Sequence, residues 1–95
     1  MLHITLWLFI TLGLASCASK PPVQVMAEAR AAVQSVRVLY ASDEAKRSQT
    51  YQHYQSAERA LKEASEALVA KKYAVAKQKA KQAKYQARMA AKLKP

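Results

Sequence analysis

Residues 54–90 read YQSAERALKEASEALVAKKYAVAKQKAKQAKYQARMA, a stretch without glycine or proline. Alanine, lysine, glutamine, glutamate and arginine predominate in it, and all of them favour helix. Its apolar side chains recur every three or four residues in two blocks: Tyr54, Ala57, Leu61, Ala64 and Leu68, then Ala76, Ala80, Ala83, Ala87 and Ala90. This spacing predicts two amphipathic helices, each with one apolar face.

The phase between the two blocks indicates a turn. Leu68 and Ala76 are eight residues apart, where a continuous heptad pattern would place seven. We therefore expect the chain to turn at Val69–Tyr73. One unbroken helix over residues 50–93 is the alternative, because this segment contains no strong helix breaker.

A third apolar block lies upstream and consists of Val25, Ala29, Ala32, Val36 and Leu39. Its helical spacing predicts a further helix. After it, Ser42 is a candidate N-cap, and the two acids that follow it suit a helix N-terminus. The next helix should begin near Asp43 or, if residues 48–50 belong to the loop, near Tyr51.

The predicted fold class is all-α, with residues 23–95 forming an Ala-rich antiparallel helical hairpin or a three-helix bundle. Alanine supplies 20 of the 95 residues, so the core buries little apolar area per residue. A chain this short forms one small domain, which excludes most enzymes. Marginal stability or self-association into a homo-oligomer is the expected consequence.

The N-terminus carries a sorting pattern. Residues 4–14 read ITLWLFITLGL, too short a run to span a bilayer but typical of the apolar region of a secretory signal. Leu-Ala-Ser-Cys at residues 14–17 then matches the bacterial lipobox, which predicts cleavage between Ser16 and Cys17 and acylation of the Cys17 thiol, with palmitate among the chains. Residues 1–16 would be the lipoprotein signal peptide. The alternative is a short anchor helix with an incidental cysteine.

The predicted tether comprises residues 17–22, where Pro21 and Pro22 keep a helix from running back to the anchor. Ala18 follows the cysteine in place of the aspartate that retains bacterial lipoproteins in the inner membrane. The lipobox resemblance therefore implies an outer-membrane protein that faces the periplasm. The lipid on Cys17 would be its only attached group, with no cofactor.

Positive charge is concentrated at the C-terminal end. The chain has 16 basic and 6 acidic residues, a net charge of +10, yet residues 71–95 hold nine basic residues and no acidic one. At 100° per residue, five of them form one line along the helix, the basic stripe: Lys77, Lys81, Lys84, Arg88 and Lys92. Like charges at this spacing destabilise a helix, so we predict that the stripe binds an anionic partner. A solvated surface, or pairing with Glu58, Glu63 and Glu66, is the alternative.

Other chemistry is sparse in the sequence. His53 is isolated from other metal ligands and nucleophiles, so we predict no metal site, no catalytic residue and no enzyme activity. Tyr51, Tyr54, Tyr73 and Tyr85 could stack on nucleobases in a cytoplasmic protein. Packing against a neighbouring helix is the interpretation that we favour for them, above all for Tyr73 at the turn.

Three sequence features resemble family 4398 of domains of unknown function. They are the A-x-x-x-L-x-x-A pattern at residues 57–64, the turn Lys71-Lys72-Tyr73, and the basic Ala-rich helix from Ala76. Residues 22–32 are similar to the first helix of that family, in which Gly-Asp commonly precedes the turn tyrosine. The resemblance implies a short exported helical domain, often carried by a lipoprotein, and it implies no activity.

The sequence thus predicts a non-enzymatic envelope lipoprotein. Its partners would be the membrane, through the lipid, and an anionic component such as lipopolysaccharide or peptidoglycan, or an envelope protein. One alternative is a Braun-type tether bonded to peptidoglycan through a terminal lysine, although Pro95 follows Lys94. A binder of polyanions or nucleic acid is the other, which export would disfavour.

Overall fold

The computed structural model describes residues 20–95, and every secondary-structure element in this range is helical. They are α2 (Val23–Arg37), the 3-10 turn η1 (Val38–Tyr40), α3 (Asp43–Lys46), α4 (Tyr51–Val69) and α5 (Tyr73–Leu93). The all-α prediction is confirmed for this part of the chain, in which no strand occurs. The predicted signal peptide and its cleavage site at Ser16 and Cys17 lie outside the described residues.

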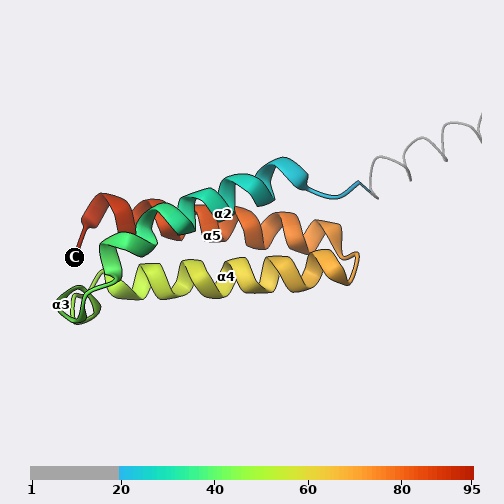
Figure 1. The fold of residues 1–95 in the computed structure, drawn as a ribbon. Helices are drawn as coiled ribbons and strands as arrows, with labels where there is room; N and C mark the ends of the chain where they lie inside the picture. Colours follow the sequence, from blue (N-terminus) through green and yellow to red (C-terminus); the bar gives the residue numbers. More distant parts are fainter. Residues whose placement is uncertain (1–19) are drawn as a thin grey trace, which may run out of the picture.

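The alanine face of α5 forms the centre of the fold. All five alanines predicted for it are buried, and we call them the Ala seam: Ala76, Ala80, Ala83, Ala87 and Ala90. Methyl side chains let neighbouring backbones approach closely, so α5 packs against both α4 and α2. Figure 1 shows α4 and α5 antiparallel and side by side, with α2 lying along α5.

The chain turns between α4 and α5, and no glycine is needed. Lys71 adopts a left-handed backbone with φ of 61°. Its N–H donates to the Leu68 carbonyl at 3.1 Å, and the N–H of Lys72 donates to the Ala67 carbonyl at 2.8 Å. These two bonds form a Schellman motif, which satisfies carbonyl groups at the end of α4. The single-helix alternative over residues 50–93 is therefore wrong.

On α2 and α4 the buried faces differ from those predicted. The innermost residues of α2 are Met26, Ala29, Val33 and Val36, and Tyr40 of η1 continues the row. Val25 and Ala32 are only half-buried, and Leu39 is 41% exposed. The predicted and the buried rows share Ala29 and Val36 and lie one residue apart elsewhere. Packing selects the row with Met26 and Tyr40, which has the larger side chains at its two ends.

A similar shift occurs on α4, where Ala60 and Ala67 are buried and the predicted Leu61 and Leu68 are half-buried. Alanine takes the innermost positions because α4 and α5 lie close together there. The leucines still pack against the core from its edge. Helical periodicity identified the correct side of the helix but not the residues at its centre.

Both predicted helix starts are used, one at the short α3 and the other at α4. The Ser42 hydroxyl accepts a hydrogen bond from the Ala45 N–H at 3.1 Å and so caps the short α3. The long helix begins at Tyr51, after a turn through residues 47–50. Ser42 therefore caps a separate short helix, and α4 starts at the second of the two predicted positions.

Three tyrosines close the end of the bundle near this loop. The Tyr40 ring is 1% exposed and stacks on Tyr54 with ring centroids 5.4 Å apart, and Tyr51 lies against both rings. The Tyr40 hydroxyl donates to the Ala90 carbonyl of α5 at 2.8 Å. This cluster joins the end of α2 to α4 and α5, so Tyr51 and Tyr54 have the packing role that we favoured for them.

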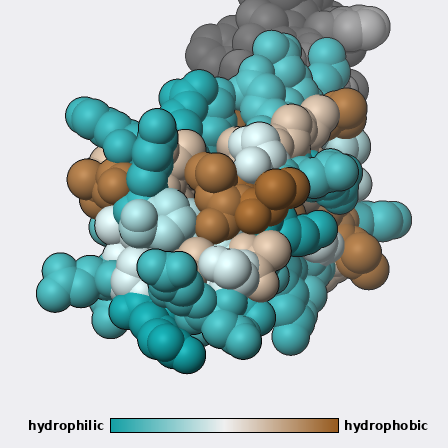
Figure 2. Space-filling model, turned by 60° about the vertical axis from the view of Figure 1, so that its left-hand side comes forward, coloured by the Kyte–Doolittle hydropathy of each residue, from teal (hydrophilic) through white to brown (hydrophobic). Residues whose placement is uncertain are grey.

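Figure 2 brings forward the end of the bundle that carries α3 and the C-terminus. Hydrophilic side chains cover most of that face, and hydrophobic ones lie in separate groups among them. The exposed large apolar residues of the described chain include Val38 and Leu93. Scattered exposure of this kind is ordinary for a small helical domain.

Candidate functional site

The basic stripe lies beside the Ala seam, on the side of α5 that faces α2. Four of its cations directly follow a seam alanine in the sequence, so they lie about 100° around the helix from it. Lys77, Lys81, Arg88 and Lys92 are exposed, and Lys84 is half-buried. The structure therefore brings the predicted residues together as one charged strip along the molecule.

Lys84 has a structural role. Its ammonium group contacts the Glu28 carboxylate of α2 in an ion pair, and Gln24 also donates to that carboxylate. The hydrogen bond from Lys84, followed by the one from Gln24, lowers the pKa of Glu28 below its usual value. One stripe cation is thus neutralised between α2 and α5, and it helps to hold α2 in place.

The alternative in which the stripe forms ion pairs with the acids of α4 is wrong. Glu63 pairs at 2.8 Å with Lys79, which lies on α5 outside the stripe, and this contact lowers the pKa of Glu63. Within residues 20–95, Glu58 and Glu66 form no ion pair. Apart from Lys84, the stripe forms no ion pair with any described residue.

An open groove lies where the start of α2 meets the first half of α5. Its volume is about 850 Å³, and we call it the α2–α5 groove. Proline and valine side chains of α2 and the segment before it line it together with Tyr73 and Ala74, while Lys20, Lys77, Lys81 and the Lys84–Glu28 pair supply its charges. It therefore combines an apolar wall with unpaired cations.

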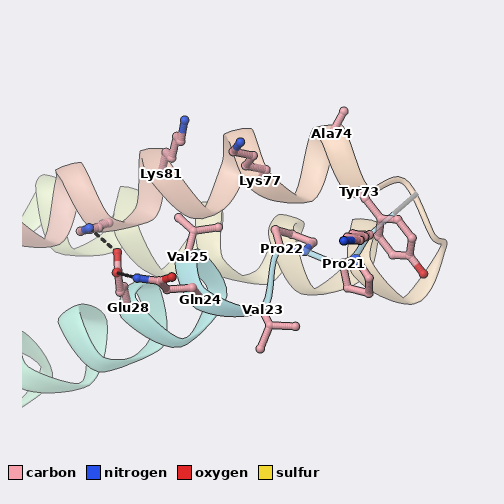
Figure 3. A pocket seen from close by; sticks show the side chains of 12 residues that line it. Pro21, Pro22, Val23, Gln24, Val25, Glu28, Tyr73, Ala74, Lys77 and Lys81 are labelled. Carbon is pink, nitrogen blue, oxygen red and sulfur yellow. Dashed lines mark hydrogen bonds and ion pairs between the residues drawn. The ribbon is translucent and has the colours of Figure 1, made fainter. Parts of the chain in front are cut away.

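Figure 3 shows how the groove is built. Pro21 and Pro22 lie on the segment that runs from the start of α2 toward Tyr73, with the Tyr73 ring beside Pro21, and Lys77 and Lys81 project from α5. Tyr73 is half-buried, in line with the packing role predicted for it. Sequence reasoning identified the stripe but missed the groove, because no periodicity indicates that Lys20 and Pro21 lie against the start of α5.

Tyr54 and His53 are held by structural contacts. Burial raises the pKa of Tyr54, and the Glu58 carboxylate acts in the same direction. The Nδ1 atom of His53 lies 2.7 Å from the Gln86 side-chain oxygen and so links α4 to α5. In the part of the chain that the structure describes, no three metal-ligating side chains cluster, and none of the helices is long and apolar enough to cross a bilayer.

Comparison with known proteins adds no relative. No protein-family model, no curated protein and no solved structure matches this chain. The similarity to family 4398 of domains of unknown function thus stays a prediction from the residues that carry it.

Proposed function

We propose that this chain is a non-enzymatic bacterial envelope lipoprotein. Residues 1–16 are its signal peptide, acylated Cys17 anchors it in the outer membrane, and residues 23–95 form a helical bundle in the periplasm. The basic α5 binds an anionic envelope component or a protein partner. The observation that carries the proposal is the lipobox at residues 14–17, directly after an apolar run of signal-peptide length.

The charge distribution supports the binding role of α5. Lys77, Lys81 and Arg88 are exposed, and no described residue forms an ion pair with them. A strip of unpaired cations raises the local potential and attracts anionic surfaces, with a strength that falls as salt screens the charges. Packing of the Ala seam requires none of these basic side chains, because the seam packs through methyl groups.

The intact mass of the protein extracted from membranes tests the anchor. The expected mass is that of residues 17–95 with a diacylglyceryl group and one further acyl chain. Cys17→Ala should abolish processing and palmitate incorporation, because the thiol that accepts the lipid is gone. Ser16→Ala is the matched control, since a small side chain remains next to the cleavage site. An unprocessed, unacylated wild-type protein would refute the proposal.

The same preparation tests the Braun-type tether. Digestion with muramidase followed by mass spectrometry would reveal a muropeptide on the C-terminal peptide that contains Lys94. We expect that peptide to be unmodified, because Pro95 follows the side chain that would form the bond. A muropeptide adduct there would replace the proposed non-covalent role of α5 with a covalent one.

A further inference from the structure

The α2–α5 groove opens at the end of the bundle where the chain leaves toward the proposed anchor. Lys20 and Pro21 line it, and both precede α2 directly. Figure 1 shows the α4–α5 turn at this same end, opposite α3 and the C-terminus. Charges and apolar groups from two segments distant in sequence, residues 20–28 and 73–84, therefore meet beside the tether.

The length of the tether limits how far the groove can lie from the membrane. Lys20 is three positions after Cys17, and an extended chain spans at most about 3.6 Å per position, which gives roughly 11 Å. The polar layer on each side of a bilayer is about 5–8 Å thick. If Cys17 is acylated, Lys20 therefore lies within or just above the lipid headgroups. The groove lies next to it.

The groove has the chemistry of a site for a phosphate headgroup. Lys20, Lys77 and Lys81 are exposed and unpaired among the described residues, whereas Lys84 is neutralised by Glu28. Lysine ammonium groups bind phosphate oxygens through charge-assisted hydrogen bonds. The apolar wall, which includes Val25, suits the glycerol and upper acyl carbons that adjoin that phosphate.

Further exposed valines lie at this end of the bundle. Val23 is 72% exposed at the start of α2, Val69 is 84% exposed at the end of α4, and Val75 is 44% exposed on the first turn of α5. The turn between the last two carries Lys71 and Lys72. Apolar side chains flanked by lysine are typical of protein surfaces that rest at the boundary of headgroup and acyl chain. Glu66 is the nearest acid in α4, one turn before Val69.

We propose that the α2–α5 groove binds the phosphate of an anionic phospholipid in the membrane that holds the anchor. The bundle then rests with its tether end against the bilayer, and the rest of the basic stripe extends away from it. The inference deepens the proposed function and rests on the anchor at Cys17, because that anchor fixes which surface the groove meets. The proposed ligand is a phospholipid within the bilayer, not a soluble anion.

Amine labelling of the membrane-bound full chain tests the proposal. Purified protein is placed in vesicles of phosphatidylcholine alone or with phosphatidylglycerol, treated with an acetylating reagent, and analysed lysine by lysine by mass spectrometry. We expect phosphatidylglycerol to slow labelling of Lys20, Lys77 and Lys81 by about threefold or more. Lys46 on α3 and Lys62 on α4 lie outside the groove and should label equally in both vesicles.

A matched pair of variants separates groove binding from general charge attraction. Lys77→Gln/Lys81→Gln removes two groove cations, and Lys46→Gln/Lys62→Gln removes the same charge elsewhere. The first pair should abolish the phosphatidylglycerol-dependent protection of Lys20, while the second should preserve it. Circular dichroism at 222 nm verifies that both variants remain helical.

Two results would overturn the groove proposal: equal labelling in the two kinds of vesicle, or equal protection by inorganic phosphate with phosphatidylcholine vesicles. The intact mass of the same sample reports the anchor separately. Protection without acylation would retain the groove and reject the acyl anchor in favour of the alternative, a short N-terminal anchor helix. Acylation without protection would retain the anchor and reject the groove.

Discussion

Replacing Lys71 by glycine should stabilise this protein, although glycine usually weakens helical segments. Lys71 has φ of 61°, and an L-residue in that region costs about 1–2 kcal/mol relative to right-handed backbone. Glycine avoids this cost but adds about 0.4–1 kcal/mol of unfolded-state entropy. The net gain in the free energy of unfolding is then about 0.5–1 kcal/mol, or roughly 2–8 °C in melting temperature for a domain of this size.

The sign of the effect distinguishes the turn from a continuous helix. In an unbroken helix over residues 50–93, Lys71→Gly would lower stability by about 1 kcal/mol. Urea and thermal unfolding, followed by circular dichroism at 222 nm, can be measured on a shortened chain that begins at Ala18 and retains every described residue. Lys72→Gly is the matched control, because its φ of −89° gives glycine no advantage. A destabilised Lys71→Gly, or an equal gain in both variants, would refute the Schellman turn.

Three further outcomes are expected from the same unfolding measurements. Tyr40→Phe should lose about 1 kcal/mol, because the hydroxyl bond to the end of α5 disappears while the ring packing stays; an unchanged melting temperature would contradict this bond. Ala83→Leu should cost about 1–3 kcal/mol through overpacking of the Ala seam, whereas Ala74→Leu at an exposed position should be near neutral; equal effects would argue against the helix packing. The pKa values of Glu28 and Glu63 are lowered in the folded state, so their contribution to stability is present above their unfolded pKa near 4.5 and is lost as the pH falls through the folded values. Glu28→Gln should therefore destabilise at pH 7 and converge on the wild type once the pH lies below the folded pKa of Glu28, and a gap that persists in stronger acid would exclude the ion pair with Lys84 as its cause.

The ion-pair partners of the glutamates could not be predicted from the sequence. The concentration of cations in α5 and their alignment as a stripe follow from counting and a 100° step, and the structure has them on one strip. Which acid each lysine meets depends on how the helices rotate against one another. Lys84 reaches α2, and Lys79, outside the stripe, reaches Glu63 of α4.

The sequence by itself determined the all-α class, the alanine face of α5 and the change of phase that separates α4 from α5. These are properties of local spacing, because a helix repeats every 3.6 residues wherever it packs. Tertiary structure decided which of two adjacent apolar rows of α2 is buried, since only contact with the other helices favours Met26 and Tyr40 over Val25 and Leu39. It also created the α2–α5 groove, because Lys20 and Lys77 are 57 positions apart and only the packing of α2 along α5 brings them to one surface.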